Sequence, residues 1–203
     1  SNVRIVTEED RGKGIVCPVD YDNVDGLVTD VPGLCLVTFY ADCVPLFFLD
    51  PVRKVIGLSH SGWRGTVAKI GLETVKKMQE VYGSRPEDTL ACIGPSICQS
   101  CYEVSGDVID AFRESFSPRL WETLFYEKPD GKYQLNLWKA NEAVFAEAGI
   151  LTEHIAVTNI CTNCNPELLY SHRASGGRRG SLAAFLALKE TQEGNQPPCI
   201  THF

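Results

Sequence analysis

Short apolar runs and one longer amphipathic segment alternate along the first part of the chain. The runs 34–40, 45–50 and 54–60 are rich in β-branched and aromatic residues and are bounded by turn residues, which predicts buried strands. Residues 66–83 instead repeat apolar side chains at the helical period, with charged side chains on the opposite face and Gly83 as a stop. This part of the chain therefore predicts three strands that lead into a helix.

The remaining sequence continues both patterns. We expect strands at 89–94, 154–160 and 181–188, a helix at 106–117, and a helix at 137–148 that Asn136 caps and Gly149 ends. Because strands and helices mix throughout, the predicted fold class is α/β (mixed α+β), a single domain with mixed β-sheets flanked by helices. We expect this domain to cover residues 1–192 and the polar, proline-rich residues 193–203 to form a loosely held C-terminal tail.

The composition is ordinary for a globular protein, with 44% hydrophobic and 22% charged residues among 203. A formal net charge of −7 argues against nucleic-acid binding, because a phosphate-seeking surface is usually basic. No run approaches the roughly 18 apolar residues of a membrane helix, and the first residues lack the apolar core of a signal peptide. We therefore expect a cytoplasmic monomer or homodimer that binds neither nucleic acid nor a membrane.

The chain contains nine cysteines, an odd number that argues for reduced thiols rather than a disulfide framework. The four that we interpret as small buried hydrophobic residues are Cys17, Cys35, Cys92 and Cys199. Cys98 and Cys101, and likewise Cys161 and Cys164, have the local spacing of half a four-thiolate structural zinc site. About sixty residues separate the pairs, more than in a compact zinc ribbon, so a metal site, a redox couple and simple packing all stay open.

Cys43 and His60 carry the first candidate chemistry. Cys43 follows the predicted strand 34–40, and His60 ends the strand 54–60, so both lie where α/β proteins place functional side chains. A thiolate and an imidazole together suit zinc, and a catalytic zinc takes three protein ligands and keeps one open position. An isolated Cys and an isolated His more often serve in packing, so the surrounding residues decide between the two interpretations.

The segment from Ser61 to Thr66 favours a functional site. It connects a strand directly to the predicted helix, and a glycine-flanked turn at a helix N-terminus presents free backbone N–H groups and the positive end of the helix dipole. Arg64 adds a bidentate donor for phosphate or carboxylate, whereas we interpret Trp63 as a core anchor. We therefore expect an anion-binding turn beside the candidate metal ligands.

Asp42 precedes Cys43 and has three interpretations: a proton-transfer group, a hydrogen-bond partner of His60, or a turn cap. The candidate catalytic residues are Cys43, His60 and Arg64. The candidate substrate- and phosphate-binding residues are Arg64, Ser61, Gly62 and Asp42.

Four segments resemble, in order, signatures of the laccase-domain (YfiH-like) family: ADCVPLFF (41–48), SHSGWRGTV (59–67), IGPSICQSCYEVSGDV (93–108) and CTNCNPELLYSHRASGGRRG (161–180). The resemblance implies a zinc-dependent purine nucleoside phosphorylase, from a family formerly described as polyphenol oxidoreductases. It implies that purine nucleosides (adenosine, inosine, guanosine and methylthioadenosine) react with phosphate, with adenosine deamination as a side activity.

The same resemblance implies one Zn²⁺ held by His, Cys and His. The family's cysteine falls on Cys43 and one histidine on His60, while the other histidine is expected upstream of Ser1. The other histidines of this chain are His154, His172 and His202, and none occupies that place. As given, the chain therefore offers two of three ligands, which predicts weak zinc binding.

One segment departs from the family pattern. An arginine-rich turn keeps Arg173, Arg178 and Arg179, but its last family arginine falls on Ser181, so a solvated basic loop is an equal interpretation. Other functions also stay open: a cysteine hydrolase that edits cell-wall precursors, with Cys43 as nucleophile and His60 as base, or a binding module without catalysis. Copper-dependent polyphenol oxidation is disfavoured, because four histidines are too few for a multicopper site.

Overall fold

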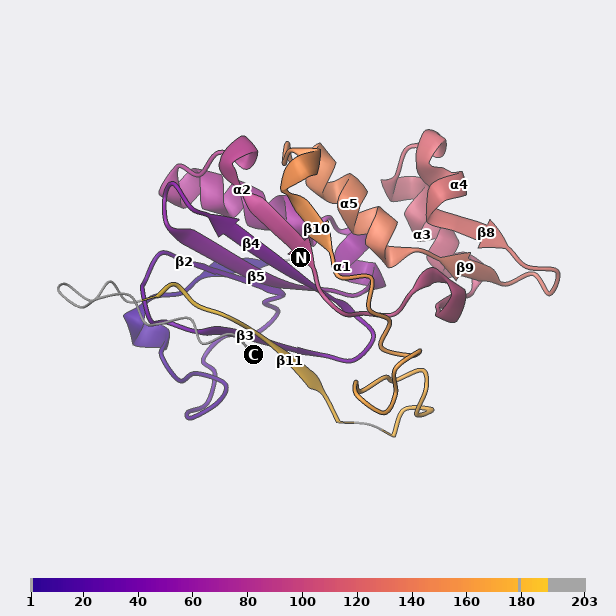
Figure 1. Ribbon diagram of the computed structural model, residues 1–203, viewed down its shortest axis with the longest axis horizontal. Coiled ribbons are helices and arrows are strands. Elements are labelled where there is room, and N and C mark those ends of the chain that lie inside the picture. Colours follow the sequence, from indigo (N-terminus) through magenta and orange to yellow (C-terminus); the bar gives the residue numbers. More distant parts are fainter. Residues whose placement is uncertain (1, 179, 190–203) are drawn as a thin grey trace, which may run out of the picture.

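The computed structural model describes residues 2–178 and 180–189. The fold is built around one six-stranded sheet (Figure 1). In spatial order the strands are β1 (Val3–Ile5), β2 (Gly26–Thr29), β5 (Val55–Ser61), β4 (Val44–Asp50), β6 (Leu90–Ile93) and β10 (Ile155–Val157). The pairs β1–β2 and β6–β10 are parallel, whereas β2–β5, β5–β4 and β4–β6 are antiparallel. This confirms the predicted α/β class with a mixed sheet in a single domain.

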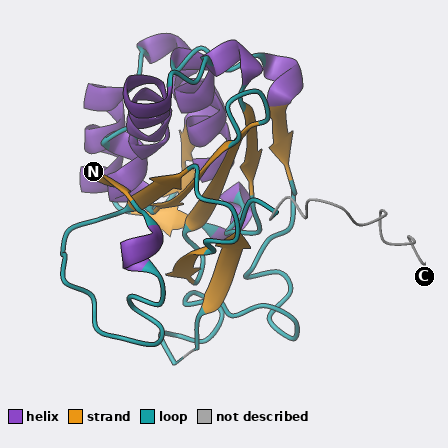
Figure 2. Cartoon of the chain, turned by 90° about the vertical axis from the view of Figure 1, so that its left-hand side faces the viewer, coloured by secondary structure: helices purple, strands orange, loops and turns teal. Residues whose placement is uncertain are grey.

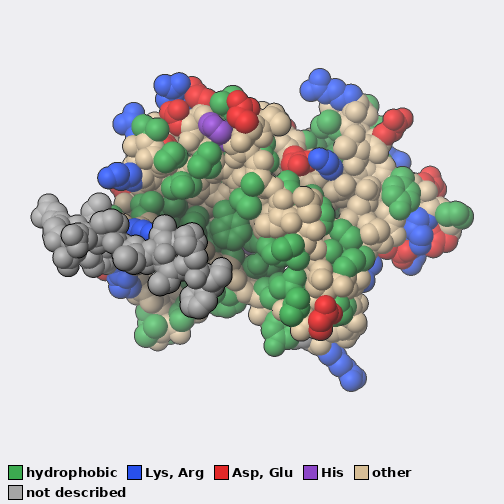
Figure 3. Space-filling view, viewed as in Figure 1, with side chains coloured by type: hydrophobic (Ala, Val, Ile, Leu, Met, Phe, Trp, Pro, Cys, Tyr) green, Lys and Arg blue, Asp and Glu red, His purple; other side chains and the backbone are tan. Residues whose placement is uncertain are grey.

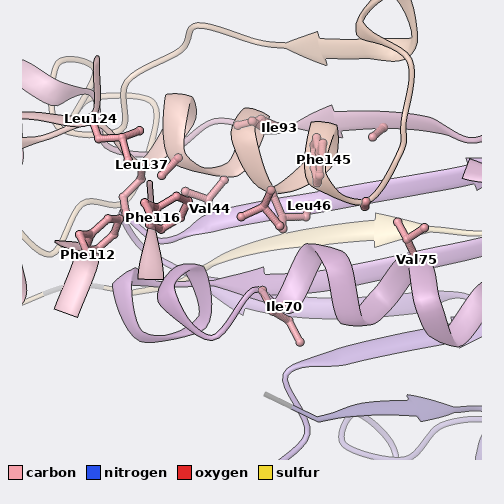
Figure 4. Close-up of a cluster of buried hydrophobic side chains, with 14 of the residues drawn as sticks. Val44, Leu46, Ile70, Val75, Ile93, Phe112, Phe116, Leu124, Leu137 and Phe145 are labelled. Atoms are coloured by element: carbon pink, nitrogen blue, oxygen red, sulfur yellow. The ribbon is translucent and has the colours of Figure 1, made fainter. Parts of the chain in front are cut away.

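Helices cover one face of this sheet (Figures 1 and 2). They are α1 (Trp63–Val67), α2 (Ile70–Tyr82), α3 (Gly106–Ser115), α4 (Trp121–Leu124) and α5 (Leu137–Glu147). The main core fills the space between, where Leu46 and Ile93 of the sheet meet Ile70 of α2 and Phe145 of α5 (Figure 4). Within the described residues, no helix is long and apolar enough to span a membrane.

The opposite face of the sheet carries a two-stranded layer, β3 (Leu36–Tyr40) paired antiparallel with β11 (Leu182–Leu186). A second buried cluster lies beneath it, formed by Leu36 and Ala184 of this layer and Ile56 and Leu58 of β5. On the side shown in Figure 3, hydrophobic side chains gather toward the middle and charged side chains lie mainly toward the edges. The central sheet is therefore covered on both faces, by helices on one and by β3 and β11 on the other.

A third, three-stranded sheet packs beside α3 and α4 and consists of β7 (Glu103–Val104), β9 (Tyr133–Leu135) and β8 (Phe125–Glu127). Short 3-10 helices complete the described elements at Glu8–Asp10, Pro86–Asp88, Gln99–Cys101, Pro118–Leu120 and Thr152–His154. The sequence pattern did not predict β1, β2, β7, β8, β9 or α4. These elements have only two to four residues each, too few for a hydrophobic period to appear.

The segment predicted as one helix at 66–83 is two helices. α1 already begins at Trp63, so that Trp63 and Arg64 are helical instead of belonging to a turn. The chain breaks at Lys69, whose φ of 57° is left-handed, and α2 follows and ends at Gly83 as predicted. Asn136 caps α5 by accepting a hydrogen bond from the Lys139 backbone N–H at 3.0 Å, which confirms the predicted cap.

Two of the cysteine interpretations are wrong. Cys17 and Cys35 are exposed because both lie in surface loops that flank short elements, and Cys92 on β6 is half-buried. Cys199 and the tail 193–203 lie outside the described residues.

The contact between α5 and the central sheet predicts that Phe145→Ala greatly lowers the stability of the fold. Phe145 is fully buried, and its ring packs edge-to-face on Phe48 of β4 with 5.3 Å between the ring centroids. We expect a loss of about 3–5 kcal/mol in the free energy of unfolding, because a cavity replaces the ring. Denaturant unfolding measures this, with Phe185→Ala as the control at a side chain that is 64% exposed. Equal losses for the two variants would contradict the described core.

Candidate functional site

The register between β4 and β5 brings the two candidate metal ligands together. Val44 pairs with Ser61 and Pro45 with His60, so Cys43, which directly precedes β4, comes opposite Gly62. Side chains alternate along a strand, and residues two apart point to the same face. Cys43 and His60 are therefore diagonal neighbours on one face of the sheet. That face is the one that β3 and β11 cover, since Cys43 packs against the second cluster.

The side chains of Cys43 and His60 both approach Gly62, which has no side chain of its own. A β-carbon on Gly62 would lie 3.1 Å from the Cys43 Sγ and 3.9 Å from the His60 Cε1, so both groups border the same point. Both residues are half-buried. Burial, opposed by the charge of Asp25, lowers the pKa of His60 and favours the neutral imidazole, which is the form that binds a metal. A thiol and a neutral imidazole that border the same glycine fit two of the ligands of a zinc site.

The alternation sends Ser61 to the other face of the sheet. Its hydroxyl is fully buried, donates to the Asn141 Oδ1 of α5 at 2.9 Å and lies 2.9 Å from the Thr66 Oγ1 of α1. The Asn141 amide nitrogen in turn donates to the Thr66 Oγ1 at 3.3 Å and to the Leu137 carbonyl at 2.8 Å. The Ser61 hydroxyl therefore fastens the start of α1 to α5 and faces away from His60, and phosphate binding by Ser61 stays a prediction.

Arg64 lies on the first turn of α1 and is exposed. Its guanidinium carbon sits 4.3 Å above the centre of the Trp63 ring, and Trp63 packs against the main core as expected. Stacking on an aromatic ring restrains a guanidinium while its N–H groups stay available to an anion. α1 has only five residues, so the side chain of Arg64, more than the helix dipole, supplies the positive charge here.

Asp42 connects three loops at the buried side of the site. Its Oδ1 accepts a hydrogen bond from the Thr162 hydroxyl and its Oδ2 accepts one from the Arg173 backbone N–H, both at 2.7 Å. Its own carbonyl accepts from the Ile97 backbone N–H at 3.0 Å. Of the three interpretations of Asp42, the structure supports the turn and loop anchor, because both carboxylate oxygens are occupied by these donors.

Tyr102 and Arg173, which the sequence analysis did not include among the candidate site residues, also lie near the site. Tyr102 follows β6, and burial, with a smaller contribution from Cys43, raises the pKa of its phenol to about 12. The Arg173 guanidinium lies 5.6 Å from the centre of the Tyr102 ring and donates to the Glu103 carbonyl at 2.8 Å. The signal that could have found both is their position inside segments 93–108 and 161–180, which carry the family resemblance.

Two hollows lie near the candidate site, one lined by Trp63 and Tyr102 and the other bordered by His60. One of about 440 Å³ is lined by Trp63, Tyr102, Ser105, Lys132 and Arg173, among others. Another, of about 310 Å³, is bordered by His60 together with Tyr21, Asp25, Thr38 and Phe39. The second hollow therefore offers room beside His60, and the first offers room beside Arg173, with Lys132 paired to Glu103 at 2.9 Å.

The two CxxC pairs also come together, in a group that does not include Cys43 or His60. Cys98, Cys101, Cys161 and Cys164 form a tetracysteine cluster in which all four Sγ atoms lie within 4.8 Å of one another. The sequence spacing left this arrangement open because the pairs lie on different loops.

Comparison with known proteins places this fold and site in a family. Residues 1–189 match the family described as multi-copper polyphenol oxidoreductase laccase. The chain is 40% identical over 194 residues to the purine nucleoside phosphorylase YlmD of Bacillus subtilis, covering 94% of this chain and 68% of the relative. It is 34% identical over 159 residues to the adenosine deaminase RL5 of an unknown prokaryotic organism, covering 78% and 60%.

Among solved structures, the Bacillus licheniformis hypothetical protein YfiH superposes with a TM-score of 0.87 at 37% identity, covering 93% of this chain and 70% of that one. These matches support a nucleoside-processing enzyme as the class of protein. The chain belongs to the laccase-domain (YfiH-like) family, as its sequence segments indicated.

Because the Cys43 Sγ lies so close to Gly62, we predict that Gly62→Ala weakens metal binding. The backbone at Gly62 has a φ of −73°, which any residue adopts, so the substitution adds only a methyl group against the Cys43 thiol. We expect zinc affinity of the full-length protein to fall about 10- to 100-fold, as when groups around a metal ligand are disturbed. Gly106→Ala is the matched control, since nothing lies within 4 Å of its added carbon. Unchanged affinity in Gly62→Ala would show that the two side chains do not share a metal there.

Proposed function

We propose that this protein is a zinc-dependent purine nucleoside phosphorylase that acts on adenosine, inosine, guanosine and methylthioadenosine, with adenosine deamination as a side activity. The observation that carries the proposal is that Cys43 and His60 lie on one face of the sheet and both border Gly62, two residues before the exposed Arg64. The names of the relatives, a purine nucleoside phosphorylase and an adenosine deaminase, support the same reaction class.

In this proposal Cys43 and His60 are two zinc ligands, and a histidine upstream of Ser1 is the third. The course of the backbone supports this arrangement. The carbonyl of Asn2 accepts hydrogen bonds from the backbone N–H groups of Asp25 and Gly26, and the Asp25 carbonyl accepts one from the His60 N–H at 2.8 Å. A residue that precedes Ser1 would thus enter the fold next to the strand end that carries His60. A zinc ion held there would act as a Lewis acid toward the substrate.

Arg64 is the proposed phosphate-binding residue. Its exposed guanidinium can make two parallel hydrogen bonds to phosphate, and the Trp63 ring beneath it limits the positions that it samples. Phosphorolysis breaks the bond between C1′ and the base with oxocarbenium character, so a phosphate oxygen held near C1′ is in place to attack as that bond lengthens. The proposed role of Arg64 is therefore to hold the nucleophile.

Tyr102 and Arg173 are the proposed substrate-positioning residues on the same side. The phenol of Tyr102, with its pKa of about 12, stays protonated at neutral pH and can donate a hydrogen bond to a nucleoside. The Arg173 guanidinium is held by the Glu103 carbonyl and lines the hollow of about 440 Å³. This hollow is large enough for the ribose or the base of a nucleoside.

Variants of the full-length protein test the proposal through phosphate-dependent release of adenine from adenosine. We expect Cys43→Ala and His60→Ala to abolish activity and the binding of zinc at this site together, because each removes a ligand. We expect Arg64→Ala to raise KM for phosphate at least about tenfold while zinc content stays unchanged, because it loses a charge-assisted contact. Arg113→Ala, on α3 and paired to Asp110, is the control for loss of an arginine elsewhere. Full activity in Cys43→Ala or His60→Ala would refute the zinc-site proposal.

The same preparation separates this proposal from the cysteine hydrolase. A hydrolase that uses Cys43 as its nucleophile and His60 as its base needs no metal, so it would stay active after chelation and be blocked by thiol alkylation. The proposed phosphorylase loses activity on chelation and regains it with added zinc. Adenosine consumed without phosphate, with inosine as the product, measures the deaminase activity separately.

A further inference from the structure

The tetracysteine cluster lies at the carboxyl ends of two neighbouring strands. β6 and β10 pair in parallel, with Ile93 beside Val157, so the loops that follow them leave the sheet at the same edge. The pairing continues into these loops: the Ser96 N–H donates to the Ile160 carbonyl at 3.1 Å and the Thr162 N–H donates to the Ser96 carbonyl at 3.3 Å. The sheet therefore fixes where the two CxxC pairs meet, although 63 residues separate Cys98 from Cys161.

The sulfur atoms converge on one centre. The Sγ atoms of Cys101 and Cys164, from different loops, are 3.5 Å apart, and all four Sγ atoms fall within 4.8 Å of one another. Four sulfurs bound tetrahedrally to one zinc at about 2.3 Å would lie about 3.8 Å from each other. The Cys98 backbone N–H also donates to the Cys161 Sγ at 3.3 Å, which joins the two CxxC pairs at a second point. We propose that Cys98, Cys101, Cys161 and Cys164 bind a structural zinc ion.

The alternatives fit this geometry less well. Two disulfides would bring the sulfurs together in two separate bonded pairs. Here all four Sγ atoms instead lie within 4.8 Å of one another, and the shortest distance between the two loops, 3.5 Å from Cys101 to Cys164, is close to that of two ligands of one ion. Packing alone would place all four side chains in the core, but Cys161 is buried, Cys98 and Cys101 are half-buried and Cys164 is exposed. A site closed by four thiolates has no open position, which is typical of structural rather than catalytic zinc.

The ion would tie together the loops that border the candidate active site. Tyr102 directly follows Cys101, and Thr162, between the other two cysteines, donates to the Asp42 carboxylate beside Cys43. Asp42 also accepts from the Arg173 N–H, and Arg173 reaches across to Tyr102 and Glu103. Zinc in the tetracysteine cluster thus holds Tyr102 and Arg173, which touch the hollow, in their relative positions.

The test uses full-length protein with Cys43→Ala, so that the proposed catalytic zinc is removed and any remaining metal is assigned to the cluster. We expect about one zinc per chain in this variant and essentially none after adding Cys101→Ser and Cys164→Ser. Cobalt in place of zinc should give intense thiolate-to-metal absorption in the first protein alone. Cys92→Ser, which alters a half-buried cysteine of β6 outside the cluster, is the matched control and should retain the metal.

If the serine variants do not fold, the reactivity of the cysteines in the Cys43→Ala protein tests the same proposal. Alkylation of the native Cys43→Ala protein, read by mass spectrometry, should leave the four cysteines protected with zinc and all reactive once a chelator removes it. Hydrogen exchange at residues 161–173 should slow when zinc is added back. Metal content unaffected by the serine substitutions would overturn the proposal, as would four cysteines found as disulfides. Zinc binding without any change in exchange would overturn the tie between the loops.

Discussion

The antiparallel register of β4 against β5 is the constraint on which the candidate site depends. A slip of one residue would turn every side chain of one strand to the opposite face of the sheet. The register is held by burial on both faces, since Leu46 and Phe48 belong to the core beneath the helices while Ile56 and Leu58 face β3 and β11. The packing of the two cores on the sheet thus places the side chains of Cys43 and His60 on the same face, although both residues are only half-buried.

The same register places adjacent residues at the end of β5 on opposite faces of the sheet, where they have different contacts. His60 faces the candidate metal site, and the next residue, Ser61, faces α5 through Asn141. The start of α1 is thereby fastened from the helix side, while the strand end stays open on the other side. This buried network on the helix side of the sheet fixes the start of α1, so it also sets the position of Arg64 and of the candidate anion site.

Local signals in the sequence predicted the features that depend on local structure. The central strands, the Asn136 cap and the stop at Gly83 follow from patterns within a few residues, and the segments around Cys43 and His60 carried the family resemblance. The roles of Asp42 and of the two CxxC pairs could not be predicted in the same way. They depend on the parallel pairing of β6 with β10 across a long crossover, and short edge strands carry little sequence signal of their partners.

The layer formed by β3 and β11 has a consequence for how the protein folds. It joins Leu36 to Leu186, so its hydrogen bonds close a loop that contains most of the described chain. Contacts between residues so distant in sequence carry a large loop-closure entropy and form slowly. On a ribosome, which releases the chain from its N-terminus, β3 has to wait until residues 41–181 have been made before its partner strand emerges. The face that bears Cys43 and His60 is therefore among the last to be enclosed, and a nascent chain exposes these residues while its helical side is already being built.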